Sequence, residues 1–438
     1  MKGSHLRHGM MVLLPLFFWA CLQEKFIQPP EIVTGSADFS RFMAIGDGFV
    51  AGITDGVMID YGQQFSIPNL IAQQVGIADF RQPMMADPGF GQDPLTGQPI
   101  GKFLLLNIHP LQVNTISLNQ SPYDLLRVPP ADSAPTYDNL AVPFHSIRDV
   151  RFANSRFFNL TNFVLREQGS QFDQAMQAKP SFVLLWAGFS DLVGLAITGR
   201  VIEGFTITPP DSFRKHLTAI VRGFREQGAQ MVMATIPDMS QFPLLTAIPP
   251  VLVDLNTLQP VLADSSDPTS VIYLQGEWSD GSIRTLSDDP NSDNFALLNL
   301  RAKDLLKQGY GYSVERGGNG LALSTRVVID KEEYRIFQAR LATLNQIIFD
   351  VASQFGVAVA DIHDFIRDIH ESGVRVGGIQ LNTRYITGGF FSLDGIHPTP
   401  AGYALIANEF IKTVNAFYSA DIPLVDVSAA LFASRRTP

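Results

Sequence analysis

Short apolar runs alternate along the chain with longer segments in which apolar residues recur with a helical period. Runs without polar alternation, as expected for strands buried on both faces of a sheet, occur at 41–46, 180–188, 229–238 and 357–362. Amphipathic segments that predict helices occur at 67–76, 212–228, 331–356 and 399–418. This order predicts an α/β fold with a parallel sheet covered by helices on both faces.

Two stretches interrupt the alternation. Residues 81–137 are rich in Pro, Gly and Asp, and residues 243–330 contain short β-like pieces around glycine-rich turns. We interpret both as loop and β-rich insertions on one domain that spans 41–423, with a C-terminal tail at 424–438. Insertions at strand ends often shape a binding cleft.

The N-terminus has the order of a secretory signal. Lys2 and Arg7 precede a continuously apolar run at 11–20, which is too short to span a membrane and ends directly before Cys21. A single cysteine at this place is typical of a lipidated mature N-terminus. We therefore predict a signal peptide at 1–20 and a lipid-anchored tether at 21–40. The alternative is an ordinary signal peptide followed by an incidental cysteine.

Composition narrows the possible partners. Of the 438 residues, 46% are hydrophobic and 17% are charged, which is enough apolar material for a substantial core. The formal net charge of −10 would repel a phosphate backbone, so no nucleic-acid partner is expected. Because Cys21 is the only cysteine, no intramolecular disulfide can form.

The stretch Gly46-x-Gly48-x-x-Ala51 satisfies a dinucleotide-binding pattern after a strand. That pattern requires a helix to begin at the glycines, so that the helix N-terminus faces a pyrophosphate. The residues that follow predict a loop, with the next helix near Pro68, and no suitable acidic residue follows about 20 positions later. A dinucleotide cofactor is therefore not expected.

Asp394 and His397 lie three residues apart, directly before a predicted helix. A carboxylate this close to an imidazole can orient it and raise its basicity, as a general base requires. The alternative is a simple capping arrangement at a helix start.

A metal site is a weaker possibility. Four potential ligands occur in one segment, at Asp361, His363, Asp364 and His370. Their spacing does not place all four on one face of a helix, and no His-x-x-x-His pair is present. The segment is therefore interpreted as a solvated surface, and neither a metal nor another cofactor is predicted.

Four segments together resemble the SGNH, or GDSL-type, lipase/esterase family, in a bacterial lipoprotein branch with large insertions. They are "FMAIGDGFVAG" (42–52), "YDNLAVPFHSIRDV" (137–150), "LLWAGFSDLVG" (184–194) and "FSLDGIHPTPAGYALIAN" (391–408). The resemblance extends over 41–423. It implies a flavodoxin-like, three-layer α/β/α sandwich and an ester hydrolase ancestry.

The resemblance also assigns roles to positions. It makes His397 the base and Asp394 the residue that orients it, but it places Gly48 where the family has its nucleophilic serine. The two further oxyanion positions hold Phe144 and Ser190 instead of glycine and asparagine. The framework positions that match are Gly46, Asp47, Gly188 and Asp191.

These departures predict degenerate catalytic blocks, because glycine has no hydroxyl with which to form an acyl-enzyme. We expect the Phe144 ring to occupy the place of the substrate carbonyl, whereas Ser190 retains a hydrogen-bond donor. Two hypotheses follow. One is a pseudoenzyme that binds a small ester, lipid or glycan-like ligand in the cleft. The other is an ester hydrolase in which His397 and Asp394 activate water. In both, we expect an exported protein, lipid-anchored in the cell envelope at the outer membrane.

Overall fold

The computed structural model describes residues 32–107, 112–118, 121–127, 137–153, 158–254 and 259–433. The predicted signal peptide, Cys21, the first part of the tether and residues 434–438 lie outside this part of the chain. Among the described residues, no helix has both the length and the apolarity that a membrane span requires.

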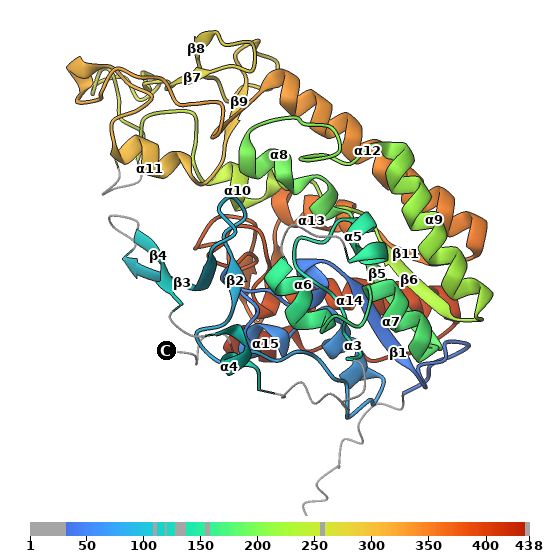
Figure 1. Ribbon diagram of the computed structural model, residues 1–438. Coiled ribbons are helices and arrows are strands. Elements are labelled where there is room, and N and C mark those ends of the chain that lie inside the picture. Colours follow the sequence, from blue (N-terminus) through green and yellow to red (C-terminus); the bar gives the residue numbers. More distant parts are fainter. Residues whose placement is uncertain are drawn as a thin grey trace, which may run out of the picture. The chain divides into compact units, whose positions relative to one another are not determined.

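The centre of the fold is a parallel sheet with the strand order β1-β5-β6-β11 (Figure 1). Its strands are β1 (Phe42–Gly46), β5 (Phe182–Trp186), β6 (Gln230–Ala234) and β11 (Ala358–Ala360). Residues 138–142 run parallel to the free edge of β1, joined by backbone hydrogen bonds from Ala44 to Asp138 and from Leu140 to Ala44. With this segment second in the chain, the order is the flavodoxin-like 2-1-3-4-5.

Helices cover both faces of the sheet, so the domain is a three-layer α/β/α sandwich (Figure 1). One face packs against α3 (Ile67–Gln74) and α14 (Pro400–Tyr418), with α13 (Ile362–Glu371) and α15 (Val427–Ala433) beside α14. The opposite layer contains α5 (Ile147–Phe152), α7 (Gln171–Ala178), α9 (Pro210–Glu226) and α12 (Lys331–Phe355). The predicted fold class is confirmed. It follows from fully buried strands such as β1 and β5, which need apolar cover on both sides.

The two insertions form small structures of their own. The first contains β2 (Gly91–Gln92), β3 (Pro99–Asn107), β4 (Gln112–Ser117) and α4 (Pro122–Leu125). The second contains α10 (Pro243–Thr246), β7 (Gln275–Glu277), β8 (Ile283–Thr285), β9 (Ala296–Leu298), α11 (Ala302–Lys307), η3 (Val314–Arg316) and β10 (Val328–Asp330). The second insertion has a separate apolar cluster around Leu274, Trp278 and Leu298, which explains how so many short strands hold together.

The remaining elements are short. They are α1 (Gly48–Ala51), α2 (Asp60–Gln63), α6 (Phe158–Leu165), η1 (Phe189–Asp191), α8 (Val193–Thr198), η2 (Met239–Gln241), β12 (Val374–Val376) and β13 (Ile379–Leu381). The prediction of a loop after the glycines was wrong. One helical turn begins at Gly48 itself and another at Asp60, before the expected helix α3. Turns of four residues leave too little periodic sequence to be recognised.

Part of the segment assigned to the tether belongs to the domain. Ala37 and Phe39 are buried, and the Phe39 ring stacks on Phe182 of β5. Val33 also bridges to Asp421 beyond the end of α14. The described tether residues therefore pack on the fold, because an aromatic residue in a polar segment can still reach the core. Similarly, α15 makes part of the assigned tail a packed helix.

Candidate active site

The turn after β1 is sterically specialised. Gly46 has a φ of 155°, and a Cβ atom there would lie 2.1 Å from the Trp186 carbonyl oxygen, so no other residue fits. Asp47 then caps α1, because its Oδ1 accepts a hydrogen bond from the Phe49 amide at 3.3 Å. The Gly-Asp-Gly sequence therefore builds a tight turn that places Gly48 at the carboxyl end of the sheet, where α/β folds bind ligands.

A buried glutamine that the sequence did not single out holds this turn. Gln171 of α7 accepts a hydrogen bond from the Gly46 amide at 2.8 Å and donates one to the Gly46 carbonyl at 2.9 Å. Its amide nitrogen also lies 3.0 Å from Nδ1 of His145, and Nε2 of that histidine lies 2.8 Å from the Thr161 hydroxyl. No sequence signal reveals this clamp, because Gln171 lies 125 positions from Gly46.

Asp394 and His397 form the predicted pair. His397 Nδ1 donates to Asp394 Oδ2 at 2.7 Å, and both residues are buried. Asp394 also accepts hydrogen bonds from the amides of Gly56, Ile396 and His397 and from the hydroxyl of Ser392. Burial alone would raise the pKa of Asp394, but the His397 charge and these hydrogen bonds lower it below its usual value. Asp394 is therefore ionised, and its bond to Nδ1 leaves Nε2 of His397 as the basic nitrogen.

Gly48 and His397 are in direct contact. A Cβ atom built on Gly48 would lie only 2.4 Å from Nε2 of His397, and 3.2 Å from Cδ2. The imidazole therefore occupies the space in which a side chain at position 48 would stand. The Phe49 ring, with its centroid 5.4 Å from the imidazole, packs on the same histidine.

Phe144 retains the backbone of the glycine that the family resemblance expects. Its φ of 62° lies in the left-handed region, which is uncommon for a bulky residue and costs roughly 1–2 kcal/mol. The half-buried side chain packs on the main core and lines the cavity next to His397. The loop thus combines a left-handed backbone with a large apolar side chain in the cavity wall.

Ser190 faces the Gly-Asp-Gly turn. Its hydroxyl donates to Asp47 Oδ2 at 3.2 Å, and its amide donates to the same oxygen at 3.3 Å. Burial raises the pKa of Asp47 to about 6, although the hydrogen bonds from Phe49 and Ser190 oppose that shift. The structure therefore uses the hydroxyl of Ser190 to hold Asp47, which ties the third sequence block to the first.

Gly188 and Asp191 support the same region. Gly188 has a φ of 127°, and a Cβ atom there would lie 2.5 Å from Cδ1 of Ile236. Asp191 Oδ2 accepts the amide of Ile147 at 2.9 Å, which fixes the start of α5 just after Phe144. Burial raises the pKa of Asp191 to about 7. All the framework positions named from the resemblance are thus gathered at one edge of the sheet.

A cavity of about 530 Å³ opens over the Asp394–His397 pair. Its walls come from the domain and from both insertions, which contribute Phe103 and Val113 on one side and Leu244 and Leu300 on the other. An ion pair of 3.6 Å between Arg301 and Asp93 joins the insertions beside it. Residues of both insertions therefore form part of the cavity wall.

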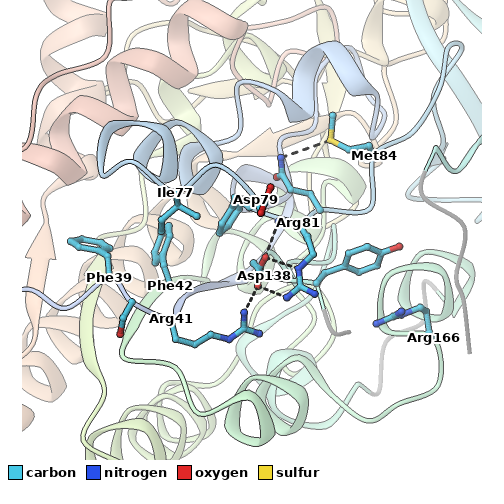
Figure 2. Close-up of a pocket in the computed structure, with 13 residues that line it drawn as sticks. Phe39, Arg41, Phe42, Ile77, Asp79, Arg81, Met84, Asp138 and Arg166 are labelled. Carbon is cyan, nitrogen blue, oxygen red and sulfur yellow. Dashed lines mark hydrogen bonds and ion pairs between the residues drawn. The ribbon is translucent and has the colours of Figure 1, made fainter. Parts of the chain in front are cut away.

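A larger cavity of about 750 Å³ lies at the amino end of β1, next to Phe42 (Figure 2). Three of its charged groups are engaged with one another. Asp138 accepts from Arg41 Nη1 at 2.8 Å and from Arg81 Nε and Nη2 at 3.0 Å each (Figure 2). Its described lining residues include no histidine and no pairing of a serine with a base. The candidate active site is therefore the cavity of about 530 Å³ that contains His397.

The possible metal ligands of α13 have other partners. Asp361 Oδ1 accepts from the Thr235 hydroxyl, and His370 Nδ1 lies 2.8 Å from the Thr383 hydroxyl. The carboxylate of Asp364 pairs with Arg367. Within the described ranges, no three His, Cys, Asp or Glu side chains gather in a way that could hold a metal ion.

The fold and the gathered blocks define an SGNH-type α/β sandwich in which the Asp394–His397 pair lies beside Gly48. The chain belongs to the GDSL-like lipase/acylhydrolase family, whose pattern it matches over residues 42–410. The predicted family is thereby confirmed. The search of curated proteins gave no match.

Two solved structures have some similarity to this chain. A lipase/acylhydrolase from Enterococcus faecalis has 11% identity and a TM-score of 0.34, with 88% of this chain and 100% of that chain covered. A GDSL-like lipase from Parabacteroides merdae has 10% identity and a TM-score of 0.36, with 87% and 99% covered. Scores at this level carry no argument about the site.

Proposed function

We propose that this protein is a ligand-binding member of the GDSL family that forms no acyl-enzyme. The observation that carries the proposal is the contact between His397 and Gly48. The base stands where the nucleophile's side chain would be, because a Cβ atom at position 48 would lie 2.4 Å from Nε2. The site has thus lost the serine hydroxyl together with the space for it.

The other changes point the same way. In serine hydrolases of another fold, removing the nucleophile lowers turnover on the order of 10⁶-fold. Losing one oxyanion donor lowers it roughly 10²–10³-fold. Here the Ser190 hydroxyl donates its hydrogen bond to Asp47, and Phe144 lines the cavity beside His397. Because these three changes all affect the same mechanism, they favour ligand binding in the cleft over ester hydrolysis.

The cavity suits a small organic ligand. Its volume of about 530 Å³ lies within the roughly 300–1,000 Å³ that is usual for such sites. Apolar side chains such as Ile53, Phe103 and Ile396 form much of its wall, with the polar His397 at the base. We therefore expect an ester, lipid or glycan-like ligand with an apolar part.

The test combines turnover with binding. Short-chain p-nitrophenyl esters are offered to the wild type, to His397→Ala and to His363→Ala, a control for a histidine outside this cavity. The proposal expects no His397-dependent turnover, together with saturable binding of a neutral ester by calorimetry. Clear turnover that His397→Ala abolishes and His363→Ala preserves would overturn it.

A variant series tests how much of the ancestral site remains. Gly48→Ser alone is expected to restore little activity, because the new side chain must displace His397. Gly48→Ser with Phe144→Gly also opens the cleft and restores a glycine to a left-handed position. Turnover from the double variant only would indicate a site still shaped for ester hydrolysis.

A second candidate function is slow, water-mediated ester hydrolysis. The observation that favours it is the intact pair, with Asp394 ionised and 2.7 Å from Nδ1 of His397. In this reaction Nε2 takes a proton from water while the oxygen attacks the ester carbonyl. The imidazolium then returns the proton to the departing alkoxide as the carbon–oxygen bond breaks, which gives an acid and an alcohol.

We also propose export and lipid anchoring through Cys21, at the outer membrane where the cell has one. The motivating feature is the basic, then apolar, N-terminus before the only cysteine. Detergent partitioning and intact mass of the wild type and Cys21→Ser test it. A Cys21→Ser protein that still partitions into the membrane would contradict lipidation at this residue.

A further inference from the structure

A second, smaller cavity adjoins the candidate active site. It has a volume of about 370 Å³ and is bounded by α10 and the residues after it, by α11, and by the loop at 383–387. Lys303 and Tyr385 line both this cavity and the one that contains His397. The Tyr385 hydroxyl donates to the Leu393 carbonyl at 2.7 Å, which fixes the ring in the shared wall. The two cavities are therefore neighbours that share a wall formed by these two residues.

The smaller cavity carries an unusual concentration of positive charge. Lys303, Lys307 and Arg384 line it together with His370, and none of its described lining residues has a carboxylate. The chain as a whole has 42 acidic and 32 basic residues, so this local excess opposes the overall charge. Cations gathered in a concave, partly apolar wall attract anions more strongly than cations on an open surface.

These cations are not used by the fold itself. Within the described part of the chain, none of the three forms an ion pair with a carboxylate. By contrast, the nearby Arg301 is paired with Asp93. Like charges four residues apart on one helix, as at 303 and 307, are slightly destabilising when nothing lies between them. An anion between the two ammonium groups would remove that cost.

Lys303 is the central group. Burial lowers the pKa of its amine; Asp304 opposes the shift and Lys307 adds to it. A half-buried amine without an ion-pair partner is poorly solvated, so it gains more from an anionic ligand than an exposed lysine does. Its position in the wall shared by the two cavities lets it contact a ligand that extends from His397.

We propose that the smaller cavity binds the phosphate group of an amphiphilic ester, through Lys303, Lys307 and Arg384, while the ester linkage lies beside His397. This inference rests on the proposed function, since it assumes that the larger cavity receives an ester. The combination of several cations suits a multiply charged phosphate better than a single carboxylate. Ile248, Val253 and Leu306 provide apolar contact for the chain that carries the phosphate.

The experiment uses a matched pair of ligands, acetoxyhexyl phosphate and acetoxyhexanol, which share an ester and differ in the phosphate. Calorimetry on the purified wild type is expected to show tighter binding of the phosphate ester, with inorganic phosphate as a competitor. Lys307→Gln with Arg384→Gln, two residues that line only the smaller cavity, is expected to weaken binding of the phosphate ester about tenfold or more and to leave binding of the neutral ester unchanged. Lys303→Gln should also weaken binding of the phosphate ester.

Lys412→Gln is the matched control, because Lys412 is an exposed surface lysine on α14. Urea midpoints check that the variants are folded. Equal binding of both esters by the wild type, or no selective effect of Lys307→Gln with Arg384→Gln, overturns this inference. Neutral-ester binding in the same experiment upholds the proposed function. Binding of neither ester overturns both. A matched acetoxy ester that carries a terminal carboxylate in place of the phosphate is a further ligand. If it binds as tightly as acetoxyhexyl phosphate, the assignment to phosphate is overturned.

Discussion

The most direct perturbation is the addition of a single methyl group at position 48. In Gly48→Ala the new Cβ atom would start 2.4 Å from Nε2 of His397, whereas ordinary van der Waals contact begins at 3.4 Å. The imidazole must therefore retreat by about 1 Å. It cannot do so freely, because Nδ1 is bonded to Asp394 at 2.7 Å and the Phe49 ring packs on it.

The expected sign is opposite to that of an ordinary glycine in a helix. Replacing a helical glycine by alanine usually stabilises by up to about 1 kcal/mol. Overfilling a packed site costs about 1–3 kcal/mol. Because Gly48 does not have a positive φ, backbone strain adds nothing to the balance. We expect Gly48→Ala to lower the free energy of unfolding by about 1–2 kcal/mol.

Urea unfolding followed by circular dichroism measures the change, with the same substitution repeated in a His397→Ala background. Without the imidazole the clash disappears, so alanine at position 48 should there be neutral or stabilising. The double-mutant cycle is expected to give a coupling of about 1–3 kcal/mol. An equal effect of Gly48→Ala in both backgrounds would refute the close contact and the proposal that depends on it.

Three further predictions concern the frame around the site. Gln171→Leu should lower the free energy of unfolding by about 1–3 kcal/mol, because it leaves the buried amide of Gly46 without a partner, whereas the Gly46 carbonyl keeps its hydrogen bond from the Val142 amide; urea unfolding measures the change. Phe144→Gly should change the free energy of unfolding by less than about 1 kcal/mol, because relief of the left-handed φ offsets the lost packing. Phe144→Val should be clearly more destabilising, because a β-branched residue must then adopt the same φ. Asp191 has a pKa raised from 3.8 to about 7, so its protonated form stabilises the fold; this contribution is complete below pH 3.8 and is lost as the pH rises through about 7. Asp191→Asn should therefore reduce the fall in the free energy of unfolding between pH 3.8 and about 7, measured by urea unfolding at several pH values. The same dependence on pH in the wild type and in Asp191→Asn would contradict this prediction.

Much of the fold was predictable from residue patterns. The strands at Phe42–Gly46 and Phe182–Trp186 and the helix at Lys331–Phe355 all appear near the predicted positions. They are readable because burial on both faces requires a continuous apolar run, and a long helix repeats its pattern many times. The helix turn at Gly48–Ala51 was missed because so short a segment carries almost no periodicity.

The candidate site was predictable only in part. Asp394 and His397 are three residues apart, so their pairing is local and visible in the sequence. The role of Gln171 and the contact of Phe39 with Phe182 are not local, since they depend on which helices and strands become neighbours. The basic cavity behind Tyr385 is likewise invisible until α11 and the loop at 383–387 are brought together.

The sequence by itself determined the family, the order of strands and helices, and the absence of a hydroxyl at Gly48. It could not show that His397 occupies the space beside Gly48 in which a side chain would stand, or that the hydroxyl of Ser190 is bonded to Asp47. Those facts depend on distances between segments far apart in the chain, and only packing of the complete fold sets such distances. Composition and spacing describe which groups are present. The tertiary structure decides which of them can reach one another.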